Sequence, residues 1–303
     1  MMQIFLFNWS KLPVYIALLL ATVYGGACLL LLFVQEQLIF VPSSEVTVTP
    51  QDLELDYEDV WLPIEEDAAA SSPEAKIHGW WIESASSSDS SNVLLYLHGN
   101  GGNVSANLYQ IERFHKLGFS VLAIDYRGYG KSSGPHPNES RVYEDAQTAL
   151  NYLMGDRGIS PDRIFLYGHS LGGAIAIETA TRNPNLAALI VQGSFTSMSA
   201  AANTQKLYSI FPLDLLVRNE FDSIEKVRSL SMPILFVHGL EDRIIPASMS
   251  EQLYGATSAP KQLHLVPEAG HNDVASVMGD DRYFAIIREF LEMVRSQQSI
   301  ELR

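Results

Sequence analysis

The sequence predicts an α/β fold: an open, mostly parallel sheet of about eight strands with helices on both faces, preceded by one N-terminal transmembrane helix. Three observations predict this fold. An uncharged apolar stretch lies near the N-terminus, short runs rich in Val, Ile and Leu alternate with helical patterns beyond it, and one of these runs leads directly into a serine flanked by glycines. Continuous apolar runs of this kind are typical of strands buried on both faces of a sheet.

The N-terminal apolar stretch is "PVYIALLLATVYGGACLLLLFV", residues 13–34, which carries no charged side chain. A membrane-spanning helix needs about 20 such residues. A cleaved signal peptide is the main alternative, because Lys11 precedes the stretch and small residues lie around Ala27. The stretch stays apolar after Ala27, where a cleaved peptide should turn polar. A buried core helix is a second alternative, but the stretch has no polar stripe. We therefore predict an uncleaved transmembrane anchor.

Beyond this helix the chain reads as one domain. Eight runs are typical of strands, at residues 53–64, 76–83, 92–99, 120–128, 163–170, 187–195, 233–242 and 261–271. Helical patterns begin near Asn103, Ser140, Leu171, Pro246 and Asp280. The predicted organisation is a short N-terminal tail at 1–12, the transmembrane helix at 13–34, a connector at 35–50 and an α/β domain at 51–303, with a short lid-like insertion at about 196–221.

Composition excludes some classes of function. The 303 residues carry a net charge of -15 with only 20 Lys and Arg, and the pI is about 4.9. A nucleic-acid-binding protein needs a basic face to neutralise phosphates, so no nucleic-acid partner is expected. The single cysteine, Cys28, excludes an intrachain disulfide and argues against a cysteine-ligated metal site.

One serine stands in the pattern of a nucleophile. The segment "RIFLYGHSLGG" runs from an apolar strand through Gly168, Ser170 and Gly172 into a helix, which is a G-x-S-x-G pattern in the strand-turn-helix context that it requires. The turn is so sharp that only small residues fit two positions before and after the serine. The alternative is a serine that merely caps a helix of a nucleotide-binding fold, but neither G-x-G-x-x-G nor a P-loop accompanies it. We predict Ser170 as the nucleophile.

A serine hydroxyl needs a base and an acid that orients the base, and with this turn they follow in the order Ser, acid, His. Only His264 and His271 come after the expected acid. His264 alternates with apolar residues inside a strand, whereas His271 follows "PEAG" just past that strand, so we predict His271 as the base. Glu241 and Asp242 are adjacent at a strand end. We prefer Asp242, which lies further into the loop, although either carboxylate can orient the imidazole.

A third element is a candidate oxyanion hole. The segment "LYLHGNGGN" ends the strand before the first covering helix, where one backbone N–H of the hole is expected. The two donors would be the N–H groups of Asn100 and Leu171, with His98 holding the loop. An ordinary glycine-rich turn or a phosphate-binding nest is the alternative for this segment alone. The segment "DYRGYGKSSG" is either a wall of the site or a turn with solvated Arg127 and Lys131.

These motifs together resemble the α/β-hydrolase superfamily and, within it, the Bem46-like and ABHD-type serine hydrolases that carry an N-terminal membrane segment. The resemblance rests on "HGNGGN", "DYRGYGKSSG", "YGHSLGG", "FDSIEKV", "HGLEDRIIP" and "GHND", and it covers nearly the whole α/β domain. It implies the α/β-hydrolase fold, a triad of Ser170, Asp242 and His271, and oxyanion positions at Asn100 and Leu171. Members include esterases, acyl-protein thioesterases and peptidases, so the resemblance leaves the substrate open.

The function predicted from these features is hydrolysis of carboxylic ester or thioester bonds by a membrane-anchored serine hydrolase, through an acyl-enzyme. The predicted partners are an acyl substrate, with lipid-linked acyl groups as one candidate, and the membrane. No metal and no organic cofactor is required. A serine peptidase of the same fold and a catalytically silent binding module are the alternatives. An intact triad and oxyanion loop argue against the silent module.

Two expectations concern the surroundings of the site. The apolar residues of the insertion either shape an acyl pocket or only pack a short helix onto the domain; they are Leu207, Tyr208, Ile210, Phe211, Leu213 and Leu215. Orientation in the membrane follows the Lys and Arg bias near the helix ends. Lys11 precedes the helix and the next basic residue after it is Lys76, so we expect the catalytic domain on the non-cytoplasmic side.

Overall fold

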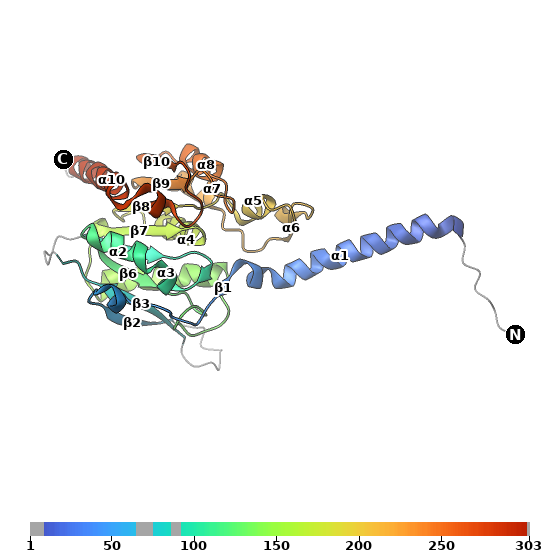
Figure 1. The fold of residues 1–303 in the computed structure, drawn as a ribbon, viewed down its shortest axis with the longest axis horizontal. Helices are drawn as coiled ribbons and strands as arrows, with labels where there is room; N and C mark the ends of the chain where they lie inside the picture. The colour runs from blue at the N-terminus through green and yellow to red at the C-terminus, as the bar shows by residue number, and fades with distance from the viewer. Residues whose placement is uncertain (1–8, 65–74, 86–91, 302–303) are drawn as a thin grey trace.

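A computed structural model describes residues 9–64, 75–85 and 92–301 of the chain (Figure 1). Most of the predicted N-terminal tail, residues 1–8, lies outside the described residues, as do residues 65–74, 86–91 and 302–303.

The core of the domain is an eight-stranded sheet in the order β10-β9-β8-β7-β4-β6-β3-β2. Its strands are β2 Glu58–Pro63, β3 Lys76–Ile82, β4 Val93–Leu97, β6 Ser120–Ile124, β7 Ile164–His169, β8 Ala188–Gln192, β9 Ile234–Gly239 and β10 Lys261–Val266. The six strands from β6 to β10 in this order are parallel, whereas β3 runs antiparallel to β6 and β2 antiparallel to β3. The predicted eight-stranded, mostly parallel sheet is confirmed.

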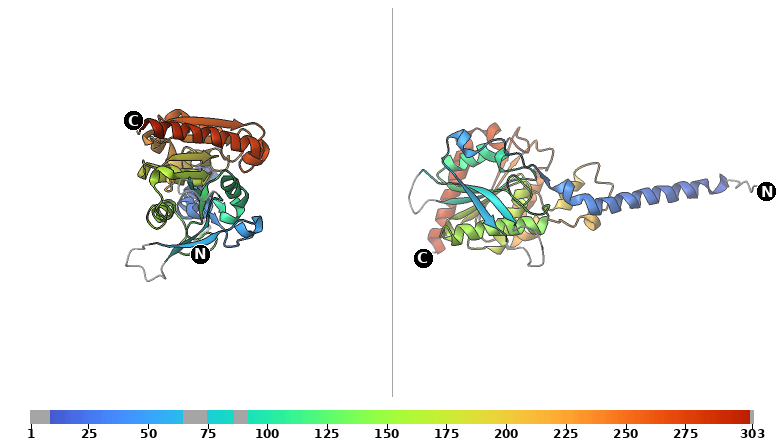
Figure 2. Two further views of the ribbon diagram at one scale, coloured as in Figure 1. Left: turned by 90° about the vertical axis from the view of Figure 1, so that its left-hand side faces the viewer. Right: turned by 90° about the horizontal axis from the view of Figure 1, so that it is seen from below.

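Helices cover both faces of this sheet (Figures 1 and 2). The helices after α1 are α2 Leu108–Lys116, α3 Glu139–Gly155, α4 Leu171–Arg182, α5 Met198–Asn203, α6 Leu213–Leu216, α7 Ser223–Lys226, α8 Ser248–Ala256, α9 Val274–Met278 and α10 Asp280–Glu301. Side chains alternate between the faces along each strand. Thus Leu95 of β4 packs in the core that α3, α4 and α8 share, whereas Leu94 packs in the core that α2 and α10 share.

A long helix, α1 Leu12–Ile39, projects away from the domain, and the first turns of the helix lie farthest from it (Figure 1). Within the described residues it is the one helix long and apolar enough to cross a membrane; its mean hydropathy reaches 2.4 and that part of it is not buried. The helix continues five residues beyond the predicted span of 13–34. It does so because Gln35, Glu36 and Gln37 are good helix formers and no proline or glycine interrupts them before Pro42.

The chain that leaves α1 runs directly to the centre of the domain. There β1 Val41–Pro42 pairs in parallel with β5 Gly101–Gly102, which belongs to the loop after β4. Phe40 is buried and packs against Phe221 at a ring distance of 6.2 Å. The helix is therefore joined to the domain without a flexible spacer.

The insertion between β8 and β9 carries the short helices α5 and α6, and it lies on the side of the domain that faces α1 (Figures 1 and 2). Residues of α1 and α6 contact each other. We call the segment 196–221 the lid.

Candidate active site

Ser170 lies on a sharp turn between β7 and α4. Its φ of 55° and ψ of -120° are strained for any residue other than glycine. The flanking glycines make this turn sterically feasible. A Cβ atom on Gly168 would lie 2.1 Å from the carbonyl oxygen of Gly172, and a Cβ on Gly172 would lie 2.1 Å from the carbonyl oxygen of Leu97. The predicted G-x-S-x-G turn is therefore present, and it presents Ser170 at the carboxyl edge of the parallel strands.

His271 and Asp242 form the pair that a serine nucleophile requires. The Nδ1 atom of His271 lies 2.6 Å from Oδ2 of Asp242, which follows β9. Asp242 is buried and its Oδ1 atom accepts the backbone N–H groups of Ile244 and Ile245, at 2.8 and 2.9 Å. Its neighbour Glu241 is exposed. Of the two adjacent carboxylates, Asp242 is therefore the one that contacts the imidazole.

A second histidine, His238 of β9, supports the same carboxylate. Its Nε2 atom lies 3.1 Å from Oδ2 of Asp242 and 2.9 Å from the carbonyl oxygen of Ile245. A carbonyl only accepts, so Nε2 carries the proton, and the Ser250 hydroxyl donates to Nδ1 at 2.7 Å. His238 precedes Asp242, so the order serine, acid, histidine excludes it as the base. Its position four residues before Asp242 is the sequence signal for a supporting role.

These contacts control the charge of Asp242. Burial by itself would raise the pKa of its carboxyl, but hydrogen bonds from His238, His271 and the N–H of Ile245 outweigh burial and lower the pKa well below its usual range. Asp242 is therefore ionised at neutral pH. It accepts the Nδ1 proton of His271, which leaves Nε2 of that ring free to accept a proton.

Ser170 and His271 line one cavity, together with Gly99, Asn100 and Leu171. The cavity has a volume of about 740 Å³. His169, next to the serine, donates its Nε2 proton to the carbonyl oxygen of His271 at 2.9 Å, and the two imidazole rings lie 4.9 Å apart. Four of the five predicted site residues therefore line one cavity, and the fifth, Asp242, contacts His271. His264, in contrast, lies within β10 beside Val237 and does not line the cavity.

The loop after β4 presents the N–H of Asn100 through a fixed peptide group. Nδ1 of His98 donates to the carbonyl oxygen of Gly99 at 2.7 Å. Because C=O and N–H point in opposite directions in a trans peptide, this bond also sets the direction of the Asn100 N–H. The carbonyl oxygen of Asn100 accepts from the N–H of Val41 at 3.0 Å and the hydroxyl of Tyr129 at 2.7 Å. Leu171 is the first residue of α4, so its N–H has no partner within the helix.

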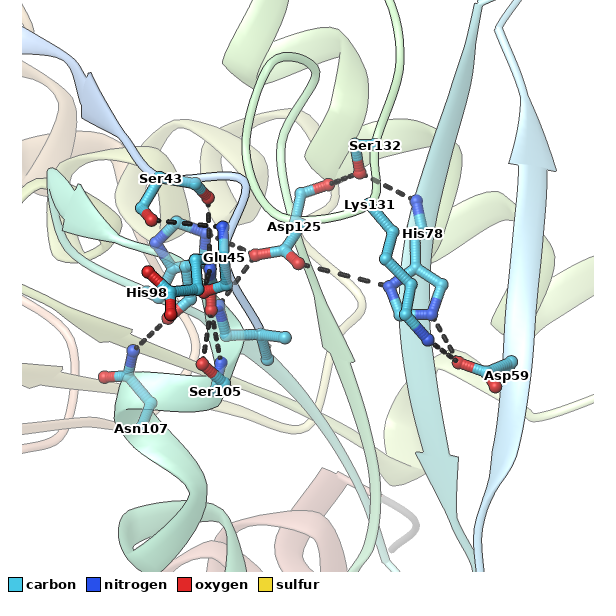
Figure 3. Close-up of polar contacts among 12 residues, drawn as sticks. Ser43, Glu45, Asp59, His78, His98, Ser105, Asn107, Asp125, Lys131 and Ser132 are labelled. Carbon is cyan, nitrogen blue, oxygen red and sulfur yellow. Dashed lines mark hydrogen bonds and ion pairs between the residues drawn. The ribbon is translucent and has the colours of Figure 1, made fainter. Parts of the chain in front are cut away.

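Behind this loop lies a buried network that centres on Asp125 (Figure 3). Its Oδ1 atom accepts the N–H of Val104 at 2.7 Å and lies 3.4 Å from Nε2 of His98. Its Oδ2 atom faces His78, which in turn contacts Asp59 at 2.5 Å. Burial acts to raise the pKa of the Asp125 carboxyl, but the neighbouring His78 and His98 and the N–H of Val104 lower it overall. The carboxylate of Asp125 therefore lies between the imidazoles of His78 and His98.

The segment "DYRGYGKSSG" does not itself line the cavity. Arg127 is buried, and its guanidinium contacts Asp145 at 2.7 Å and Glu144 at 2.7 Å. The expectation of a solvated Arg127 is wrong, because this side chain bridges the segment to α3. Burial raises the pKa of Asp145 to about 6, against the lowering effect of Arg127.

The lid only partly matches its predicted role. Tyr208 and Leu213 line the cavity, and Leu216 and Val217 add to the same wall. The remaining predicted lid residues do not: Leu207, Ile210 and Leu215 are exposed, and Phe211 packs against Tyr24 of α1.

Comparisons with known proteins find relatives that match most of the chain. Residues 88–223 match the serine aminopeptidase S33 family of hydrolases. The chain is 34% identical to protein bem46 of Schizosaccharomyces pombe over 260 residues, which is 82% of this chain and 81% of that protein. It is 30% identical to the α/β hydrolase domain-containing protein WAV2 of Arabidopsis thaliana over 290 residues, 89% of this chain and 91% of that protein.

Solved structures show the same fold. An esterase from Pyrococcus furiosus superposes with a TM-score of 0.67 at 22% identity, covering 84% of this chain and 98% of that one. An acylaminoacyl peptidase from Pyrococcus horikoshii superposes with a TM-score of 0.60 at 16% identity, covering 80% of this chain and 42% of that one. Because identity of 30% or more to bem46 and WAV2 extends over most of each chain, the protein belongs to the Bem46-like family of α/β hydrolases.

Proposed function

We propose that this hydrolase is a membrane-anchored serine esterase or thioesterase in which Ser170, His271 and Asp242 form the catalytic triad. The observation that carries the proposal is the strained turn at Ser170, which opens into the same cavity as a histidine held by a buried, ionised aspartate. Strain at a single polar residue is retained where its side chain must be presented to a reactant.

The proposed reaction is acyl transfer to water. Nε2 of His271 takes the proton of Ser170, and the serine oxygen forms a bond to the carbonyl carbon of the substrate. The N–H groups of Asn100 and Leu171 stabilise the oxyanion. The bond to the leaving alcohol or thiol then breaks, and His271 returns the proton to that leaving group. A water molecule, deprotonated by His271, releases the acyl group as the acid and restores Ser170.

The proposal of a retained anchor is supported by contacts of α1 in the folded protein. Gln35 and Tyr24 both hydrogen-bond the lid, and Leu31 lines the cavity. Cleavage of a signal peptide near Ala27 would remove Tyr24 and its contact with the lid. On the Lys11 bias, the catalytic domain lies on the non-cytoplasmic side. Protease access to a C-terminal tag, in sealed vesicles of known orientation, tests on which side of the membrane the catalytic domain lies. If the tag is degraded only after the cytoplasmic face is opened, the domain is cytoplasmic.

A fluorophosphonate probe tests the enzymatic proposal. We expect the probe to label the folded protein, and we expect Ser170→Ala to abolish labelling. His271→Ala should lower kcat/KM for a soluble ester at least about 10³-fold, as for removal of a triad base. The matched control is His264→Ala, which changes a histidine of β10 away from the cavity and should keep its activity. Folded protein that the probe does not label would favour a silent binding module.

A second candidate activity is peptide hydrolysis, which the serine aminopeptidase description of the matched family and the acylaminoacyl peptidase fold neighbour favour. A panel of esters and thioesters from acetyl to palmitoyl, with one peptide amide, distinguishes the two. We expect kcat/KM to rise with chain length, because each buried methylene contributes about 0.8 kcal/mol. A sharp preference for the peptide would instead assign the peptidase activity.

A further inference from the structure

The cavity at Ser170 does not end within the α/β domain. It reaches Leu31, Gln35, Leu38 and Ile39 of α1, so the last turns of the apolar helix form one of its walls. The volume of about 740 Å³ lies within the range of about 300–1,000 Å³ that small-molecule sites occupy. An apolar helix that extends out of the domain thus also lines the site.

Two polar side chains of α1 bind the lid. Gln35, only 8% exposed, accepts the N–H of Arg218 at 2.7 Å and donates to the carbonyl oxygen of Leu216 at 3.3 Å. Tyr24 donates its hydroxyl to the carbonyl oxygen of Ile210 at 2.9 Å. In hydrocarbon every backbone polar group needs an internal partner, and these two contacts supply partners to lid carbonyls.

The contacts place the lid alongside the apolar part of α1. Gln35 is eleven positions after Tyr24, which corresponds to about 16 Å along a helix. Tyr24 lies well inside the uncharged stretch of α1, so the lid follows the helix into the predicted span. Figure 1 shows α5 and α6 on this side of the domain.

The outer surface of the lid also suits a lipid environment. Its exposed apolar side chains are Leu207, Ile210 and Leu215, at 70%, 64% and 83% exposure. Several large apolar side chains exposed within one short segment favour an interaction of that segment with membranes or proteins. The exposed Lys206 has a long apolar stem that lets its ammonium group reach the headgroups.

We propose that the cavity binds the acyl chain of a membrane lipid, which enters laterally from the bilayer between α1 and the lid. This inference rests on the proposed function, since the carbonyl of the chain must lie at Ser170. The chain then runs along Leu31 and Leu38. The polar residues Asn107, Gln110 and Arg113 also line the cavity, and we assign the leaving group to them.

A trapping experiment with the full-length protein in phosphatidylcholine vesicles tests the direction of the chain. The probe is a hexadecyl fluorophosphonate with a diazirine at the end of the alkyl chain, which first reacts with Ser170 and is then photolysed. We expect cross-links to residues 31–39 of α1 and 213–217 of the lid. Cross-links confined to 107–113, or to no part of α1 or the lid, would overturn the inference while leaving the serine hydrolase intact. A failure to label Ser170 would instead refute the proposed function.

A pair of variants on α1 adds a kinetic test. Leu31→Trp narrows the cavity, whereas Leu30→Trp makes the same change at an adjacent residue that is 60% exposed and outside the cavity. We expect Leu31→Trp to lower the ratio of palmitoyl to butyryl ester kcat/KM at least about tenfold, since each buried methylene is worth roughly fourfold. Leu30→Trp should leave the ratio unchanged. Equal ratios in the two variants would overturn the inference. If Leu31→Trp does not fold, Leu38→Trp tests the same wall.

Discussion

Nδ1 of His98 lies 2.7 Å from the carbonyl oxygen of Gly99, and this single contact sets the direction of the peptide N–H that belongs to Asn100. His98 does not line the cavity, so it acts through the loop and is a positioning residue. On the other side of its imidazole, Nε2 lies 3.4 Å from Oδ1 of Asp125.

We therefore expect His98→Leu to lower kcat for a soluble ester about 10²-fold, near the loss that follows removal of one oxyanion donor, with little change in KM. His98→Asn should recover part of the activity, because its side-chain amide N–H can take the place of Nδ1–H. Steady-state kinetics of both variants measure this. An equal decrease of kcat in the two variants, or a change in KM with kcat unaffected, would show that His98 only supports the fold.

His238 gives a second prediction, since it donates to the same Asp242 oxygen as His271. Without this donor the carboxylate is held less firmly, so His238→Leu should lower kcat about tenfold, the value of one charge-assisted hydrogen bond of roughly 1.4 kcal/mol. His238→Gln keeps an N–H donor and should stay closer to the wild type. Ser250→Ala, which removes only the partner of Nδ1, is the matched control and should have the smaller effect on kcat. A full rate in His238→Leu contradicts the role.

The glycines of the turn predict a large difference between two identical substitutions. A Cβ on Gly172 would lie 2.1 Å from the backbone oxygen of Leu97, which cannot move without distorting β4, whereas a Cβ on Gly155, at the end of α3, meets nothing within 4 Å. Gly172→Ala should lower the free energy of unfolding by at least about 3 kcal/mol. Gly155→Ala should raise it by less than about 1 kcal/mol. Chemical denaturation checks both values, and similar stabilities would refute the steric account.

Much of the fold and the candidate triad could be predicted because the signals are local. Each buried strand is a continuous apolar run, and Ser170 carries its glycines within two residues on either side. The order of acid and base along the chain then left few candidates. Asp242 could be preferred over Glu241 only by its place in the loop, and the structure supplies the physical reason: one carboxylate is buried with four donors and the other is exposed.

The contacts that the sequence did not reveal join residues far apart in the chain. Gln35 and Leu216 are an example: a glutamine after an apolar helix gives no sign of the lid carbonyl that it binds. For the same reason the extent of the cavity along α1 was not predicted, and four of the six lid residues expected to line the cavity do not line it. His98 was expected to hold its loop, but its neighbour Asp125, which directly follows β6, was not identified.

The last prediction concerns pH and follows from His169. The pKa of His169 is lowered to about 4, against about 6.5 for an unperturbed histidine. Burial is the main cause of this shift, and the neighbouring His271 is the second. Between these two values the unfolded chain binds a proton at this position and the folded protein does not. The contribution of neutral His169 to stability is therefore complete above about pH 6.5 and is lost as the pH falls towards 4.

His169→Phe removes both this titration and the hydrogen bond to the His271 carbonyl. We expect the stability deficit of His169→Phe, measured by urea denaturation, to be largest near pH 7.5 and to shrink steadily at pH 5.5 and 4.5. A deficit that stays constant over this range would show that His169 titrates alike in the folded and unfolded states.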